Sequence, residues 1–157
     1  MLVISLLYDL EKMDKTIVVG VCIKSESNEI LMVQENKWEI KGLFNIPAWR
    51  LNSSESIFEW AIREAKEETG YDVKLNSILC IQYLENKKLL KIIFNATIIS
   101  GAVDFDKNEI MNVKWIPIDE LEKMTEKELR SYDSNINIIR NAKNNKEYPL
   151  NIIENLR

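Results

Sequence analysis

The sequence delimits one helix at both of its ends, and the β-rich segments on either side must pack around it. Ser56 is followed three residues later by Glu59, which fits a capping box at a helix start. Gly70 fits the position just past a helix end, where a left-handed backbone conformation is needed. We therefore expect a helix between Ser56 and Gly70.

This helix has a packing face and an acidic stripe beside it. At about 100° per residue, one face collects Phe58, Ala61, Ile62, Ala65 and Thr69. Glu64, Glu67 and Glu68 fall on a neighbouring stripe. We expect these carboxylates to flank the core and to be partly sheltered from water.

β-rich runs precede and follow the helix. The runs are residues 16–24, 29–34, 43–47, 73–84, 88–100 and 112–118. Polar residues 25–28 and 85–87 predict hairpin turns, and Pro47 stops the third run. The rest of the chain, from Asp119, predicts short helices. This order predicts an α/β fold, an α/β/α sandwich with a central mixed sheet.

Length and charge limit the organisation and the partners. The 157 residues fit one domain, expected over 16–157 after an N-terminal extension of residues 1–15. That extension lacks the features of a signal peptide and is too short to span a bilayer, which predicts a cytoplasmic protein without a membrane partner. A net charge of −4 without a basic block argues against binding along duplex nucleic acid. No feature indicates an oligomeric state.

The absence of histidine limits the chemistry. Ser–His and Cys–His catalysis and His-ligated metal sites are excluded. Cys22 and Cys80 lie in apolar runs and are expected to be buried, reduced thiols. Any metal must then be held mainly by oxygen, which favours magnesium, manganese or calcium.

The acidic stripe disfavours the helix that carries it. Glu64 and Glu68 are like charges four residues apart, which costs roughly 0.2–0.5 kcal/mol. Glu67 and Glu68 also lie in the last turn, where the helix dipole costs each about 0.3–1 kcal/mol. One interpretation is a solvated acidic face, with Arg63 balancing some of the charge. The other is a metal site, because carboxylates at this spacing converge on one cation.

The segment from Glu55 to Tyr71 resembles the Nudix box of the Nudix hydrolases. It reads E-x7-R-E-A-x-E-E-x-G-Y, and the flanking "GLFNIPAWRLNSSES" and "VKWIPIDEL" resemble the strands around that box. The resemblance covers roughly residues 16–125. Nudix proteins have an α/β/α sandwich fold and hydrolyse a nucleoside diphosphate linked to a further group. The resemblance therefore implies a metal-dependent pyrophosphohydrolase with a small-molecule nucleotide substrate.

The resemblance also implies roles for the glutamates. Glu64, Glu67 and Glu68 would bind Mg²⁺ or Mn²⁺, and Glu64 or Glu67 could act as the catalytic base. Some Nudix proteins use a glutamate from the loop before the last strand, where Glu109 is the candidate. A plain surface position for Glu109 stays equally open.

Structural and substrate-binding residues follow from the same resemblance. Arg63 would pair with a box carboxylate such as Glu55, and Gly70 would end the helix. The segments "LMVQE" and "PA-x-R-x4-E" are similar to the branch that removes oxidised guanine nucleotides, especially diphosphates. Candidates for stacking on a base are Phe44, Tyr83 and Trp115, which could equally be core residues. Removal of a 5′ pyrophosphate from RNA is a further alternative, against which the acidic charge argues.

One position departs from the Nudix pattern. The box should begin with glycine where this chain has Trp49, which is costly if the backbone there needs a positive φ or a close approach to phosphate. Trp60 lies on the carboxylate side of the helix and could pack against Trp49 at the pocket entrance, or both could form a local apolar patch. Two functions follow: an active pyrophosphohydrolase, or a nucleotide-binding or regulatory module with impaired catalysis. The intact glutamates favour the enzyme.

Overall fold

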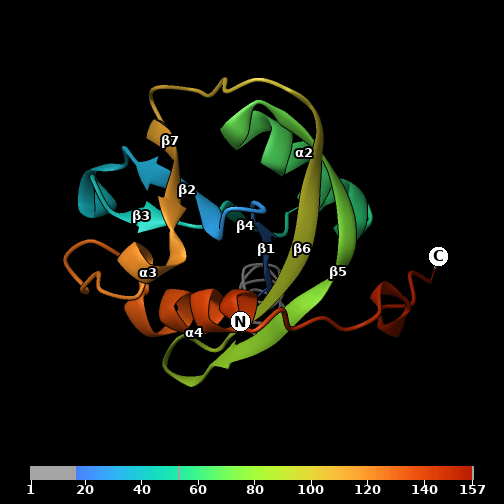
Figure 1. Ribbon diagram of the computed structural model, residues 1–157. Helices are drawn as coiled ribbons and strands as arrows, with labels where there is room; N and C mark the ends of the chain where they lie inside the picture. Colours follow the sequence, from blue (N-terminus) through green and yellow to red (C-terminus); the bar gives the residue numbers. More distant parts are fainter. Residues whose placement is uncertain (1–16, 53, 157) are drawn as a thin grey trace, which may run out of the picture.

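Two sheets lie between helices in the computed structural model, which describes residues 17–52 and 54–156 (Figure 1). The strands are β1 (Ile17–Ile23), β2 (Glu29–Glu35), β3 (Phe44–Asn45), β4 (Ala48–Arg50), β5 (Tyr71–Leu84), β6 (Leu89–Gly101) and β7 (Ile110–Pro117). The helices are α2 (Ile57–Thr69), α3 (Ile118–Leu121) and α4 (Tyr132–Lys143), with 3-10 turns η1 (Trp38–Ile40), η2 (Glu85–Lys87) and η3 (Leu150–Ile152). The predicted extension of residues 1–15 lies outside the described residues.

The larger sheet is mixed, as predicted. Its order is β4-β1-β6-β5, with β1 parallel to β6 and the other neighbours antiparallel. The smaller sheet has the order β3-β2-β7 and is antiparallel throughout. α2 and α4 cover opposite sides of this arrangement (Figure 1). The predicted α/β/α layering is therefore confirmed.

The first predicted hairpin is present only at its turn. Ser25 N–H donates to the Glu29 carbonyl at 2.9 Å, and Lys24 and Ile30 form a single bridge. Beyond that bridge β1 and β2 belong to different sheets, so the prediction of a paired hairpin was wrong. Both strands are buried almost throughout, and each finds its partners in strands distant in sequence. The second predicted hairpin is confirmed, because β5 and β6 pair from Tyr71–Gly101 to Leu84–Leu89.

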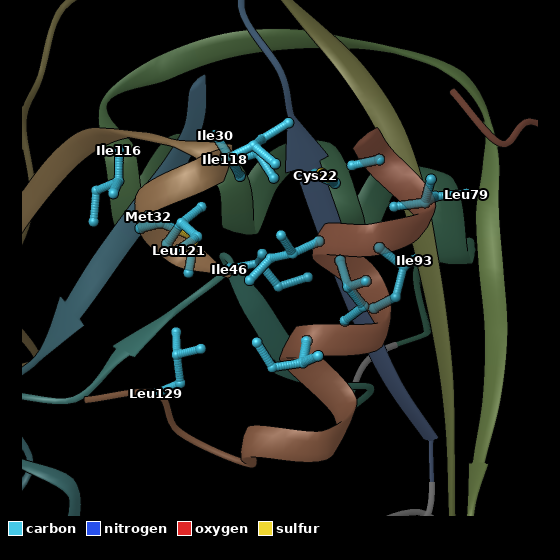
Figure 2. Packing of buried hydrophobic residues seen from close by; sticks show 14 residues of the cluster. Cys22, Ile30, Met32, Ile46, Leu79, Ile93, Ile116, Ile118, Leu121 and Leu129 are labelled. Carbon is cyan, nitrogen blue, oxygen red and sulfur yellow. The ribbon is translucent and has the colours of Figure 1, made fainter. Parts of the chain in front are cut away.

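Two apolar clusters fill the space between the layers. The cluster under α4 contains Cys22, Ile30, Met32, Ile46, Leu79, Ile93, Ile116, Ile118, Leu121, Leu129, Ile136, Ile138, Ile139 and Ala142 (Figure 2). The cluster under α2 contains Val19, Val21, Ile23, Leu31, Trp60, Ala61, Ala65, Val73, Leu75, Ile78, Ile92, Phe94 and Ala96. Cys22 is buried as expected, whereas Cys80 is half-buried, and both thiols are free. No helix in the described part of the chain is long and apolar enough to cross a membrane.

The ends of α2 are those predicted. The Ser56 side chain accepts from the Glu59 N–H at 3.2 Å, and the Ser56 N–H donates to the Glu59 carboxylate at 3.0 Å. Gly70 ends the helix with φ +82°.

The packing face of α2 is rotated from the predicted one. Its buried or half-buried predicted members are Phe58, Ala61, Ala65 and Thr69. Ile62 is 39% exposed and does not join them, whereas Trp60, at 7%, is buried. A helical wheel predicts burial from the angle of each residue around the helix axis alone. The docking of α2 beside β4 and β5 decides which edge of the face is covered.

Candidate active site

A cavity of about 390 Å³, the main cavity, lies where α2, β4, the β5–β6 hairpin and the start of α4 meet. Its acidic lining residues are Glu35, Glu64, Glu68 and Glu109. Its basic lining residues are Lys37, Arg50, Lys87, Lys91 and Arg130. Trp49 and Trp60 are the aromatic residues among its described lining. The volume is within the range of small-molecule sites, and both signs of charge are present.

The predicted glutamates of α2 gather beside this cavity. Glu64 and Glu68 line the main cavity itself. Glu67 joins them around an adjoining space of about 410 Å³, the acidic hollow, which Glu109 and Asp106 also line. Glu109 lies in the loop just before β7. The structure therefore brings all four predicted glutamates together.

Arg63 connects the helix to the loop before it. Its Nε donates to both Glu55 oxygens at 3.1 Å, and its Nη2 donates to Glu55 Oε2 at 3.0 Å. Its Nη1 lies 2.7 Å from Glu67 Oε1 and 3.0 Å from Glu64 Oε1. The guanidinium also lies 4.7 Å from the centre of the Trp60 ring. The Arg63–Glu55 pair expected from the sequence is thus present, and it is bidentate.

The residues of the acidic hollow fit a divalent cation chemically, although they are not arranged as a ligand set. No group of three histidine, cysteine or acidic side chains in the described residues has a metal-binding arrangement. Arg63 forms ion pairs with Glu64 and Glu67. Glu68 Oε2, however, is buried without a hydrogen-bond partner among the described residues. Carboxylate oxygens are the ligands that Mg²⁺ and Mn²⁺ prefer, and a cation would satisfy this buried atom.

Burial raises the pKa values of two of these glutamates, Glu68 and Glu64. Burial, reinforced by the charge of Glu35, raises the pKa of Glu68 to about 8. The Trp49 indole partly offsets that shift, although its N–H completes no hydrogen bond of ordinary geometry among the described residues. Burial and then the charge of Glu67 raise the pKa of Glu64, while Arg63 lowers it.

Trp49 fits its position without backbone strain. Among the described residues, the non-glycine positions with positive φ are Asn28, Lys88, Ser131 and Asn145. Trp49 instead continues β4 and pairs with Val19 of β1. The conformational objection to tryptophan therefore does not apply here. Trp49 and Trp60 both line the main cavity, and both indole nitrogens are buried without partners in the described part of the chain.

The aromatic residues predicted to stack on a base lie elsewhere. Phe44 packs against the cluster under α4, and Trp115 packs against the cluster under α2. Tyr83 is 62% exposed and is absent from the described lining of the main cavity, as are the other two. Its neighbour Leu84 lines that cavity, because successive residues of a strand face opposite sides. Residue type alone did not reveal which side each aromatic faces.

Of the charged residues that line the main cavity, Glu35, Lys37, Arg50, Lys87, Lys91 and Arg130 were not predicted. Glu35, only 4% exposed, accepts from Arg130 Nη1 at 2.7 Å. Lys91 is 7% exposed and lies near the start of β6, within its buried apolar stretch. A lone charge inside a buried apolar run is itself a signal, since such side chains are rarely buried without a partner. Arg130 carries no comparable signal, because it lies in a polar segment.

The sequence and the structure match known proteins. A family model described as the NUDIX domain matches residues 14–136. Nudix hydrolase 8 of Arabidopsis thaliana is 34% identical over 108 residues, covering 65% of this chain and 29% of that protein. The 8-oxo-dGDP phosphatase NUDT18 of Danio rerio is 36% identical over 86 residues, covering 55% of this chain and 26% of that protein. This chain thus spans less than a third of the length of either relative.

A solved structure shows the same fold over nearly the whole chain. A NUDIX hydrolase from Nitrosomonas europaea matches with a TM-score of 0.79 and 24% identity. The match covers 90% of this chain and 97% of that one. This match shows that the two proteins share a fold, meaning the same arrangement of strands and helices.

Proposed function

Because this chain belongs to the Nudix family, we propose that it hydrolyses a pyrophosphate bond in a nucleoside di- or triphosphate or a derivative of one. The observation that carries this proposal is the gathering of Glu64, Glu67, Glu68 and Glu109 around the acidic hollow. That hollow shares Glu64, Glu68 and Glu109 with a main cavity large enough for a small ligand. A carboxylate cluster beside a cavity with basic walls suits a polyphosphate chain and the cation that accompanies it.

The carboxylates of α2 would hold Mg²⁺ or Mn²⁺ through Glu64, Glu67 and Glu68. The bound cation would supply neutralisation of phosphate charge and a lower pKa for a bound water. In the hydrolysis, water oxygen attacks one phosphorus and the bridging P–O bond breaks. Glu109, Glu64 or Glu67 accepts the proton from the water. Arg63 keeps α2 fixed to its preceding loop through Glu55.

Oxidised guanine nucleotides are the substrates that we propose to test first. Support comes from the relative that is named an 8-oxo-dGDP phosphatase, whose match is confined to part of each protein. The alternative of a binding module with impaired catalysis depended on Trp49 being ill suited to its position. Trp49 continues a regular strand, so backbone strain does not favour the alternative, whereas the indole does line the main cavity and its effect on substrate access is left to the turnover assay. Location in the cytoplasm stays a prediction from the sequence.

Product release from a nucleotide panel tests the proposal. The panel would contain 8-oxo-dGDP, dGDP, dGTP and ADP-ribose, each with Mg²⁺, with Mn²⁺ and with chelator. We expect turnover that requires a divalent cation and falls at least about 100-fold in Glu67→Gln, as for loss of a group used in the chemical step. Glu126→Gln, an exposed position outside the cavities, is the matched control. Unchanged turnover in Glu67→Gln would refute the assignment of the site, and absence of turnover with every substrate would refute the activity.

A further inference from the structure

Lys91 is a buried cation that lines the main cavity. Its Nζ donates to Ser134 Oγ at 2.9 Å, and that hydroxyl donates onward to Gln82 Oε1 at 2.6 Å. None of the ion pairs among the described residues includes Lys91. An ammonium has three N–H donors, so a hydrogen bond to one neutral hydroxyl leaves donors to spare and the charge uncompensated. Buried charges are ordinarily paired, which makes this one an indication of a missing anion.

Two further cations lie at the same end of the main cavity. Lys87 and Arg130 line it and act on Lys91 through their charges. Burial, followed by the charges of Arg130 and Lys87, lowers the pKa of Lys91 to about 8. Arg130 is paired with Glu35, whereas Lys87 has no ion pair within the described residues. We call this part of the cavity, formed by Lys87, Lys91 and Arg130, the basic end.

The N-terminus of α4 adds partial positive charge to the basic end. Ser131, the N-cap residue, lines the main cavity, and its carbonyl accepts from the Asn135 N–H at 3.1 Å. No side chain of the described residues caps α4, and Asp133 of its first turn is exposed and does not line the cavity. The first N–H groups of a helix have no partner within the helix, and they attract anions. The backbone of α4 therefore favours the same kind of ligand as the side chains.

The basic end is distinct from the acidic hollow. The charge of Glu35 raises the pKa of Glu68, and Glu35 is itself held by Arg130. Arg130 in turn lowers the pKa of Lys91. The Glu35–Arg130 pair thus connects Glu68 of α2 with Lys91 of β6. An anion on Lys91 is consequently a different group from one that shares a cation with Glu68.

We propose that Lys87, Lys91 and the N-terminus of α4 form a phosphate-binding subsite that works without a metal ion. The proposal rests on the proposed function and adds that one phosphate of the substrate lies at the basic end, while the cation holds another at the acidic hollow. Phosphate oxygens accept several hydrogen bonds at once, so one group compensates Lys91 and engages its free N–H donors. The substrates are then those with a phosphate beyond the group that the cation holds.

Binding of inorganic phosphate in the presence of chelator tests the subsite without metal and without turnover. Phosphorus NMR titrations at constant ionic strength would compare the wild type, Lys91→Met and Lys87→Met. Lys88→Met is the matched control, because Lys88 is an exposed neighbour that does not line the cavity.

We expect the wild type to bind phosphate and each cavity lysine to contribute according to its burial. Lys91→Met should weaken binding roughly 10- to 100-fold, as for loss of a charge-assisted hydrogen bond. Lys87→Met, at an exposed position, should weaken it roughly 2- to 5-fold. Lys88→Met should bind as the wild type does.

Thermal melts separate phosphate binding from a structural role of Lys91. A ligand that binds the folded state raises the thermal midpoint with its concentration. We expect inorganic phosphate with chelator to raise the midpoint of the wild type and of Lys88→Met, and to leave that of Lys91→Met nearly unchanged. Equal rises in all three proteins would assign Lys91 a structural role and overturn the subsite.

Analogues with methylene bridges, which resist hydrolysis, identify the phosphate that occupies the subsite. Binding of the dGDP, dGTP and 3′-phosphorylated dGDP analogues would be measured with Mg²⁺ in the wild type and in Lys91→Met. A larger loss for the dGTP analogue assigns the subsite to the end of the phosphate chain. A larger loss for the 3′-phosphorylated analogue assigns it to a second phosphorylated group, and equal losses assign it to the shared diphosphate. No loss with any analogue would overturn the role in substrate binding.

Two further outcomes would overturn the subsite itself: no phosphate binding by the wild type, or an equal loss in Lys88→Met, which would indicate general attraction to positive charge. The proposed function fails separately, if no pyrophosphate bond is hydrolysed. Phosphate binding in the presence of chelator decides the role of the basic end in either case.

Discussion

At the scale of single residues, the buried ammonium of Lys91 links binding to stability. Its pKa falls from 10.5 to about 8 on folding, which costs the folded state on the order of 3 kcal/mol at neutral pH. Below pH 8 both states are protonated and the cost is complete. Between pH 8 and 10.5 the folded state is neutral while the unfolded state still holds its proton, so stability rises with pH.

Lys91→Met should therefore be more stable than the wild type at pH 7. The lost hydrogen bond to Ser134 offsets about 1 kcal/mol of the relieved cost, and about 1 kcal/mol shifts a chain of this size by roughly 2–4 °C, so we expect the thermal midpoint to rise by roughly 4–8 °C. The gain should shrink towards pH 10. Circular dichroism melts at both pH values measure this. A lower midpoint at pH 7 would mean that the hydrogen bond to Ser134 outweighs the burial of charge.

Glu68 makes the stability of the folded state fall as pH rises, which is the opposite of the effect of Lys91. Burial raises the pKa of Glu68 to about 8 in the metal-free folded state, whereas in the unfolded state this carboxyl ionises near its ordinary pKa of 4.5. Between these two values the folded state keeps a proton that the unfolded state has lost. The contribution of Glu68 is thus most favourable at low pH and is lost as pH rises towards 8. Glu68→Gln removes this dependence, so its advantage over the wild type in thermal midpoint should widen from pH 5 to pH 8. A constant difference across that range would contradict the burial of this carboxylate.

Trp49 contributes packing, and its removal should not create activity. Trp49→Gly would remove a side chain that packs on the cluster under α2 and place glycine within β4. We expect a loss of about 2 kcal/mol in urea unfolding and no gain in turnover. Trp49→Phe should retain most of the stability. Increased turnover in Trp49→Gly would show that the indole obstructs the cavity.

At the scale of elements, the end of α2 requires a glycine for two separate reasons. Gly70 has φ +82°, and a Cβ there would collide with the Ala102 carbonyl oxygen and the Asp104 nitrogen. Gly42 has φ +87° but open space around it. Gly42→Ala should cost about 1 kcal/mol, from the backbone conformation alone. Gly70→Ala should cost more than about 2 kcal/mol and lower turnover, because the loop after β6 must move. Equal losses in urea unfolding would contradict the role of the close contact.

The elements that were predicted well are those specified by neighbours in sequence. The capping box and Gly70 set both ends of α2, and residues 85–87 set the turn between β5 and β6. The pairing of β1 with β6, and of β2 with β7, depends on contacts distant in sequence that no local pattern encodes. The same limit applies to α2, where docking buried Trp60 and left Ile62 exposed.

At the scale of the whole molecule, a bound cation should stabilise the fold through the acidic hollow. Mg²⁺ or Mn²⁺ binds the folded state, where the carboxylates are gathered, and so raises the thermal midpoint with concentration. We expect this rise in the wild type and in Glu126→Gln, and a much smaller one in Glu68→Gln. Scanning calorimetry with and without chelator measures it. Equal rises in all three proteins would place the cation elsewhere.

The candidate site was predictable to the extent that it lies on one helix. Glu64, Glu67 and Glu68 could be placed on one stripe from helical spacing, and the family pattern added Glu109. Lys91 and Glu35 come from strands of different sheets, so their meeting in one cavity follows from topology. We propose that residues 16–157 form one domain, within which these distant segments must be assembled together.

The parallel pairing of β1 and β6 has a consequence for biosynthesis. Ile17 pairs with Leu90, so α2 and β5 are translated before β1 can find its partner. Local helices and hairpins form within microseconds, whereas pairings that close long loops come later. A nascent chain therefore displays the acidic helix well before α4 emerges to enclose Lys91. Ligands bind only the completed fold, so they would slow its unfolding without hastening its formation.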